Sequence, residues 1–160
     1  MEALFTHLYN FDNGHVYDHL EPNEVIKYRE NAQNTGLFLR ACADLYDLTG
    51  NERYFNEIDK AASFFIGKEW NGEAMHIHQP GDAAGFKAIF SRHLRYVSDK
   101  FNLPQYLEWM RFCADTAWSN RNKYGLICND FCIKTPDHRL FRAFDCHCAV
   151  VLFIQCVEKE

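Results

Sequence analysis

The sequence predicts an all-α fold made of helical hairpins, and three observations lead to this prediction. Apolar residues recur every three or four positions over several stretches, which is the spacing of one face of an α-helix. The pattern repeats after 52 residues, because apolar positions of 37–62 fall on apolar positions of 89–114. Short and long connections alternate between the helices. A repeat of about 50 residues with such alternation is typical of an α/α toroid or an α-solenoid.

The first predicted hairpin is the clearest. Apolar side chains mark one helix over residues 37–48 and a second over residues 54–65. Between them, Gly50 suits the left-handed conformation that ends many helices, and Asn51 suits the N-cap of the next helix. We therefore expect a sharp turn here between two antiparallel helices.

The second predicted hairpin repeats this arrangement. Its helices cover residues 86–97 and 106–117, and the segment Asn102–Pro104 separates them. Proline is tolerated in the first turn of a helix, because its missing N–H would have no partner there. The chain is therefore expected to turn back on itself at this second short connection as well.

Helices are also predicted near both ends of the chain. The apolar stripe over residues 141–152 marks the start of a third hairpin, and residues 1–10 look like the second helix of a preceding pair. The long connections, residues 10–30, 67–83 and 121–139, each lie between hairpins, so they gather at one end of the bundle. Function usually resides on such loops, because the helices beneath hold them in place.

The composition is that of a globular protein and excludes several function classes. The 160 residues suit a single domain over 1–160, with 48% hydrophobic and 24% charged residues. A net charge of -5 without a basic stripe argues against nucleic acid as a partner. The longest apolar run, 149–154, is too short to span a membrane, and the first ten residues lack signal-peptide features. Seven scattered cysteines, an odd number, indicate reduced thiols and favour a cytoplasmic location.

Five short segments are similar, in the same order, to motifs of one enzyme family. They are Gly14–Asp18, Asn34–Leu39, Leu45–Asn51, Phe86–Arg92 and Ala117–Arg121. The segment Phe86–Arg92 is the most specific, because it is similar to the family's Phe-Lys-Gly-Ile-Phe-x-Arg helix. The chain thus resembles the C-terminal half of glycoside hydrolase family 76, the α-1,6-mannanase-like enzymes. The resemblance implies a partial ring of an (α/α)6-type toroid and hydrolysis of α-mannosidic bonds without a cofactor.

The departures from the family pattern are equally informative. The family's adjacent Asp-Asp pair supplies the nucleophile and the acid/base from its first half, and no such dipeptide occurs in this sequence. Retaining glycosidases need two carboxyl groups about 5 Å apart, so we assign no catalytic residue here. Gln33 and Thr35 replace a family Tyr and Gln, and Ala88 replaces a Gly. The chain is expected to be a fragment of a full enzyme, a truncated gene product, or a half-ring that pairs with another chain.

Seven residues on or next to the long loops are candidates for binding sugar. They are Tyr17, Asp18, Asn34, Thr35, Asp82, Phe86 and Lys87. Tyr17 could stack on a sugar ring, and Asp18 could accept a hydrogen bond from a hydroxyl or could cap backbone N–H groups in a turn. Asn34 and Thr35 could bind hydroxyls or could serve as an N-cap.

The last three candidates belong to or precede the most specific motif. Asp82 could cap the helix that carries Phe86, or it could face the cleft. Lys87 is expected in the first turn of this helix, where a cation opposes the macrodipole. Such a local cost indicates a role for Lys87, for example binding a hydroxyl or fixing a carboxylate.

Two tryptophans could be buried or could hold a sugar. Trp118 ends an amphipathic helix, so we expect it in the core. Trp70 is placed on a long loop, and both interpretations remain open for it.

Three spacings resemble metal sites, but we assign a metal to none of them. They are Cys128-x3-Cys132, Cys146-x-Cys148 and His76-x-His78. On a helix, Cys146 and Cys148 would point about 200° apart and could not share one ion. No third ligand is evident for the histidine pair, and zinc needs four converging ligands. We therefore expect no metal and no cofactor.

The favoured hypothesis is the later half of an α-1,6-mannanase-like hydrolase that contacts a mannan-like polysaccharide or oligosaccharide. The alternative is a non-catalytic binding or scaffold module of helical hairpins, which the missing acids favour. A weaker alternative is another six-hairpin enzyme such as a sugar epimerase, with His93 and His147 as its catalytic pair. Open ring ends would expose apolar surface, so we expect self-association. The family resemblance suggests a secreted or cell-surface protein, in contrast to the reduced thiols.

Overall fold

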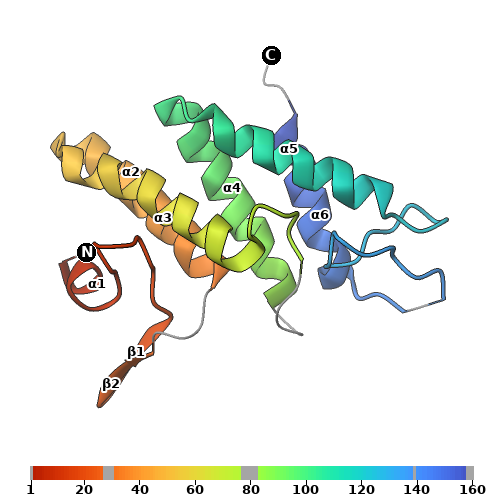
Figure 1. Ribbon diagram of the computed structural model, residues 1–160, viewed down its shortest axis with the longest axis horizontal. Coiled ribbons are helices and arrows are strands. Elements are labelled where there is room, and N and C mark those ends of the chain that lie inside the picture. Colours follow the sequence, from red (N-terminus) through yellow and green to blue (C-terminus); the bar gives the residue numbers. More distant parts are fainter. Residues whose placement is uncertain (1, 27–30, 77–82, 139, 158–160) are drawn as a thin grey trace.

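The computed structural model describes residues 2–26, 31–76, 83–138 and 140–157. Along the chain the elements are α1 (Glu2–His7), β1 (His19–Glu21), β2 (Glu24–Ile26), α2 (Ala32–Thr49), α3 (Glu52–Trp70), α4 (Ala83–Phe101), α5 (Pro104–Ser119) and α6 (Ala143–Cys156). The prediction of an all-α fold is confirmed, since the one sheet in this part of the chain is the short antiparallel pair β1–β2 (Figure 1). No helix within the described ranges combines the length and the apolar character needed to cross a bilayer.

The two short turns follow from the residues that the sequence places there. Gly50 ends α2 with a φ of 65° and donates its N–H to the carbonyl oxygen of Tyr46 at 2.8 Å. The side chain of Asn51 accepts the N–H of Arg53 at 3.0 Å and so caps α3. At the second turn, Pro104 occupies the first turn of α5. Both hairpins, α2–α3 and α4–α5, therefore turn where the sequence predicts.

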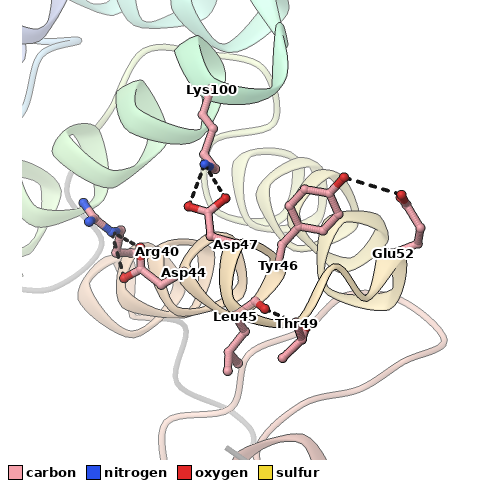
Figure 2. Close-up of polar contacts among 8 residues, drawn as sticks. All are labelled: Arg40, Asp44, Leu45, Tyr46, Asp47, Thr49, Glu52 and Lys100. Atoms are coloured by element: carbon pink, nitrogen blue, oxygen red, sulfur yellow. Dashed lines mark hydrogen bonds and ion pairs between the residues drawn. The ribbon is translucent and has the colours of Figure 1, made fainter.

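Helices α2, α4 and α6 lie side by side and run in the same direction. Near the start of α2, Gly36 is so close to α4 that an added Cβ would lie 2.8 Å from the Cα of Phe90. At the other end, the Lys100 ammonium of α4 lies 2.6 Å from the Asp47 carboxylate of α2, as Figure 2 shows. The N-terminal half of α2 thus contacts the N-terminal half of α4, and the C-terminal ends of the two helices also contact each other. The two helices must therefore be parallel.

The same relation holds between α4 and α6. Gly85 in the first turn of α4 lies against the ring of Phe144 in the first turn of α6. Near the other end, the Arg95 guanidinium donates to the carbonyl oxygens of Gln155 and Val157, the latter at 3.2 Å. The three parallel helices therefore form one continuous layer.

Helices α3 and α5 run in the opposite direction and form a second layer over the first (Figure 1). They contact each other through Tyr106, whose hydroxyl donates to the Asp59 carboxylate at 2.6 Å. Further along, the rings of Trp70 and Trp109 stack with their centroids 5.3 Å apart. The arrangement is thus two layers of helices joined by short turns at one end.

The two tryptophans that the sequence left in question, Trp70 and Trp118, differ in burial. Trp70 is 3% exposed and packs against Phe65, Phe90 and Trp109, so it is a core residue. Trp118 was expected in the core, and this is wrong because the side chain is 53% exposed. Trp118 lies on the last turn of α5, where the guanidinium of Arg121 sits 4.2 Å from the ring centroid.

The starts of the three parallel helices and the long connections all lie at one end of the molecule. We call this end the rim: it comprises the described residues 8–26, 71–76 and 120–138 with the first two turns of α2, α4 and α6. In Figure 1 the rim runs from the lower left, where β1 and β2 lie, to the right-hand side, where the loop after α5 lies. The predicted gathering of the long loops at one end is therefore confirmed by the parallel course of α2, α4 and α6.

Candidate functional site

A tight loop between α1 and β1 presents Tyr17 and Asp18. Gly14 has a φ of 86°, and a Cβ at this position would lie 2.5 Å from the carbonyl oxygen of Lys60, so only glycine fits. The N–H of Tyr17 donates to the carbonyl oxygen of Leu8 at 2.9 Å, which folds the loop back onto the end of α1. The backbone that carries both candidates is thereby fixed.

Asn34 connects this loop to helix α2. Its side-chain amide donates to the backbone carbonyl oxygen of Asp18 at 3.1 Å and to the Asp18 carboxylate at 3.0 Å. The N-cap of α2 is Asn31, whose side chain accepts the N–H of Gln33. The capping alternative for Asn34 and Thr35 is therefore wrong, because both lie inside the helix.

The Asp18 carboxylate holds partners on both of its oxygens. One oxygen accepts from Asn34, and the other lies 2.9 Å from Nδ1 of the neighbouring His19. This hydrogen bond to Asp18 is the main cause that raises the pKa of His19. These bonds of Asp18 join helix α2 to the exposed strand β1, and they do not cap a turn.

Three of the predicted residues line one pocket of about 260 Å³. Its wall consists of Leu8, Val16, Tyr17, Asp18, Asn34, Leu37, Phe38 and Ala41. Tyr17 is half-buried there, and its hydroxyl accepts a hydrogen bond from the amide of Asn10 at 3.1 Å. The pocket combines an aromatic ring, a carboxylate and an amide with apolar side chains, among them Leu37 with 47% exposure.

The remaining candidates lie elsewhere on the rim. Thr35 is 2% exposed in the first turn of α2, and Phe86 is half-buried in the first turn of α4. Asp82 lies outside the described residues. Helix α4 begins at Ala83, so Lys87 lies in its second turn and the argument from the macrodipole at the first turn does not apply.

Lys87 is buried and joins two rim loops. Its side chain is 4% exposed, and its ammonium donates to the carbonyl oxygens of Met75 at 2.8 Å and Asn129 at 2.6 Å. The ammonium also lies 5.0 Å from the ring centroid of Phe131. Burial lowers the pKa of Lys87 to about 8, although nearby acidic groups such as Asp130 act in the opposite direction.

The sequence did not reveal the hydrogen-bond partners of Lys87, because these partners are main-chain atoms. Met75 and Asn129 act through main-chain carbonyl oxygens, which every residue has, so no residue type marks them. A second feature that was missed is the approach of Glu73, His76 and Cys132, whose ligand atoms all lie within 4.8 Å of one another. The two loops that carry these residues are distant in sequence, and only the fold brings them together.

The cysteines are reduced as predicted, and the two histidines of the alternative catalytic pair, His93 and His147, lie on helices α4 and α6. All seven cysteines are thiols, and four of them are buried: Cys42, Cys113, Cys128 and Cys148. His93 lies on α4, where burial first, and then Arg40, lower its pKa. His147 lies on α6 with its ring stacked on Phe144, at a centroid distance of 6.2 Å.

Comparison with known proteins gives one family and several solved structures. The model of glycosyl hydrolase family 76 matches residues 4–138. The α-1,6-mannanase GH76A from Salegentibacter sp. HEL1_6 superimposes with a TM-score of 0.81 at 22% identity, covering 97% of this chain and 48% of that chain. An inactive variant of that enzyme, with two consecutive aspartates replaced by alanine and α-1,6-mannotetrose bound, superimposes with the same TM-score and coverage at 21% identity.

A further structure supports the same fold. The Lin0763 protein from Listeria innocua superimposes with a TM-score of 0.86 at 17% identity, covering 97% of this chain and 45% of that chain. No curated protein shows a significant match to the sequence. The chain thus spans about half the length of these solved structures, and its two helical layers form a partial α/α toroid.

Proposed function

The chain belongs to glycosyl hydrolase family 76, and we propose that it forms the second half of an α-1,6-mannanase-like toroid whose rim binds α-1,6-linked mannose. The observation that carries this proposal is the pocket in which Tyr17, Asp18 and Asn34 converge. These residues come from two segments that the sequence separates by a long connection. A binding site requires side chains from different segments to converge, as these do at the rim. A simple turn requires only residues that are neighbours in sequence.

The chemistry of the pocket suits a sugar. A pyranose ring offers an apolar face and a set of hydroxyl groups, so it needs one flat or apolar wall and several hydrogen-bonding partners. Tyr17 and Leu37 supply the wall, and the Asp18 carboxylate and the Asn34 amide supply the partners. A volume of about 260 Å³ lies just below the range of about 300–1,000 Å³ for pockets of drug-sized ligands, which suits one sugar unit of a longer oligosaccharide.

The other candidates take supporting or neighbouring roles in this proposal. Lys87 is too deeply buried to meet a sugar directly, so it acts by holding the loops of Met75 and Asn129 in place. Thr35 is buried in the first turn of α2, so its role in this proposal is in packing and not in direct contact with sugar. Phe86 is proposed to contact the oligosaccharide further along the rim, and the role of Asp82 stays a prediction from sequence.

Hydrolysis requires a pair of catalytic carboxyl groups, and we propose that this half of the toroid does not supply them. A retaining glycosidase places one carboxylate as nucleophile and another as acid/base about 5 Å apart. The sequence contains no adjacent aspartates, and we assign no catalytic residue to it. In the proposed enzyme the catalytic carboxylates therefore come from a first half of the toroid, while this half binds and orients the substrate.

The test joins this chain to the first half of the Salegentibacter α-1,6-mannanase. We expect the fusion to bind α-1,6-mannotriose and to release shorter products, measured by calorimetry and by chromatography. Tyr17→Ala and Asp18→Asn should each weaken binding several-fold, because they remove the wall and the charged acceptor. Asn56→Ala, an exposed change on α3, is the matched control and should leave binding unchanged.

The outcomes separate the proposal from its alternative. A folded fusion that binds mannotriose without cleaving it would favour a non-catalytic binding or scaffold module, which the missing aspartate pair already supports. A folded fusion that neither binds nor cleaves would overturn both. Binding that is equally strong in the Tyr17→Ala and Asp18→Asn variants would place the sugar site elsewhere.

The open end of the partial toroid supports a further expectation, self-association of the isolated chain. The exposed face of α6 carries Val150 and Ile154, which are 55% and 62% exposed, and Val157 directly after the helix is 64% exposed. A groove beside it runs between α5 and α6, with Trp118 and Phe153 in its wall. Sedimentation should show a concentration-dependent oligomer that Ile154→Glu weakens. A wild-type monomer at all concentrations would contradict this expectation.

A further inference from the structure

Two rim loops meet next to Lys87, one after α3 and one after α5. The N–H of Phe131 donates to the carbonyl oxygen of Met75 at 3.1 Å. Beside this bond, the thiol of Cys132 donates to the carbonyl oxygen of Ala74 at 3.3 Å. The two loops are therefore joined by one bond between main chains and one bond from a thiol.

Three side chains with different ligand atoms converge where these loops touch. Glu73 offers a carboxylate oxygen, His76 an imidazole nitrogen and Cys132 a sulfur, and the three atoms lie within 4.8 Å of one another. In a tetrahedral zinc site with bonds of about 2.0–2.3 Å, the ligand atoms lie about 3.5 Å apart. Rotations about the side-chain bonds that move each ligand atom by roughly 1 Å would bring the three atoms to this spacing without moving the loops.

The main chain at all three residues is already fixed. The N–H of Glu73 donates to the carbonyl oxygen of Trp70 at 2.7 Å. The Trp70 indole in turn donates to the carbonyl oxygen of His76 at 3.3 Å, and the Cys132 N–H donates to the Asp130 carboxylate at 3.0 Å. A site whose backbone is held by such bonds loses little entropy when an ion arrives.

We propose that Glu73, His76 and Cys132 bind a divalent transition-metal ion of the zinc type, which fastens the two rim loops together. Zinc accepts oxygen, nitrogen and sulfur ligands, whereas calcium and magnesium prefer oxygen alone. On binding, the Cys132 thiol releases its proton to solvent, and the carboxylate and thiolate together balance the two positive charges of the ion. Water completes the fourth position.

The surroundings are consistent with a site that fills from solvent. Glu73 and Cys132 are exposed and His76 is half-buried, so an ion can reach all three. The ion would lie on the outer side of the contact that Lys87 secures from within through Met75 and Asn129. The inference does not rest on the proposed binding of mannose.

The test uses the full chain with zinc alone, and with cobalt(II) as a spectroscopic probe. We expect one ion per chain, a higher melting temperature with zinc, and the charge-transfer absorption of a cobalt–thiolate bond. Cys132→Ser should abolish that absorption, and Glu73→Gln should weaken zinc affinity by more than tenfold. The matched controls Cys146→Ser and Glu108→Gln should change neither.

Three results would overturn the proposal. They are the absence of zinc binding at micromolar concentration, cobalt–thiolate absorption that survives Cys132→Ser, and equal losses in the Cys146→Ser control. Circular dichroism and the melting temperature of the metal-free Cys132→Ser variant show whether it is folded. If that variant does not fold, Glu73→Gln with calorimetry decides the question, because an exposed carboxylate can be replaced without disturbing the core.

Discussion

Lys87 and Lys100 lie near the two ends of the same helix, α4, and they hold the molecule together in different ways. Lys87 is buried at the rim and donates to the carbonyl oxygens of Met75 and Asn129. Lys100 is exposed at the opposite end and pairs with the Asp47 carboxylate at 2.6 Å. Burial lowers the pKa of Lys87 to about 8, whereas the hydrogen bond to Asp47 raises the pKa of Lys100.

The difference shows how each end of the molecule is stabilised. At the end with the short turns, helices contact helices, and the polar contacts include the Asn51 cap and the Lys100–Asp47 ion pair. Figure 2 shows this ion pair. At the rim, a helix must hold irregular loops, so a long side chain reaches their main-chain carbonyl oxygens. Because main-chain acceptors do not depend on residue type, this contact sets no requirement on the side chains at positions 75 and 129.

The largest effect is expected from Lys87→Met. The change removes two charge-assisted hydrogen bonds and leaves the carbonyl oxygen of Asn129 without its donor, which should cost about 2 to 4 kcal/mol of unfolding free energy. Urea unfolding at pH 7 measures this loss. Lys68→Met, an exposed change near the end of α3, is the control and should stay close to wild type. Equal losses of unfolding free energy in Lys87→Met and Lys68→Met would contradict the prediction that the buried lysine contributes more than an exposed one.

The next effect concerns pH and has opposite signs for the two lysines. The folded-state pKa of Lys87, about 8, lies below its ordinary value of 10.5, so between these pH values the unfolded chain binds more protons. Stability relative to Lys87→Met should therefore rise from pH 8 to pH 10.5, by on the order of 3 kcal/mol. The contribution of Lys100 is present below 10.5 and is lost at higher pH. A flat difference between wild type and Lys87→Met would contradict this prediction.

A smaller effect is expected where glycines let neighbouring helices approach. In Gly36→Ala the new methyl would meet the backbone of Phe90 at 2.8 Å, so α2 and α4 must separate, at about 1 to 3 kcal/mol. In Gly85→Ala the methyl would meet the ring of Phe144, which is 41% exposed and can rotate away. Thermal unfolding of both variants should show the larger loss for Gly36→Ala. The reverse order would mean that α6 packs more rigidly than α2.

The smallest effect is expected from Lys100→Met. The pair with Asp47 is exposed and screened by salt, so its removal should change the melting temperature least of the set. Added salt should reduce the difference between this variant and wild type, while the effect of Lys87→Met should persist. A loss that salt does not reduce would show that Lys100 contributes through packing along α4.

The sequence predicted the helices well because their signals are local. Periodic apolar residues, the Gly50 cap and the Pro104 start depend on neighbours only a few positions away, and all three predictions are confirmed. The boundaries were less accurate: α4 begins at Ala83, earlier than the apolar pattern indicated, which moves Lys87 into the second turn. Trp118 was misplaced because an amphipathic pattern does not tell which flank of a helix another helix will cover.

The sequence by itself therefore determined the helical hairpins, their direction and the gathering of the long loops at a common rim, because periodicity and turn chemistry act over a few residues. Tertiary structure alone decided which loop atoms meet. Asn34 binds Asp18 over 16 positions, and Lys87 binds two carbonyl oxygens over 12 and 42 positions. Glu73 approaches Cys132 over 59 positions. No local pattern specifies such distances, since they follow from how parallel helices pack and where their loops end.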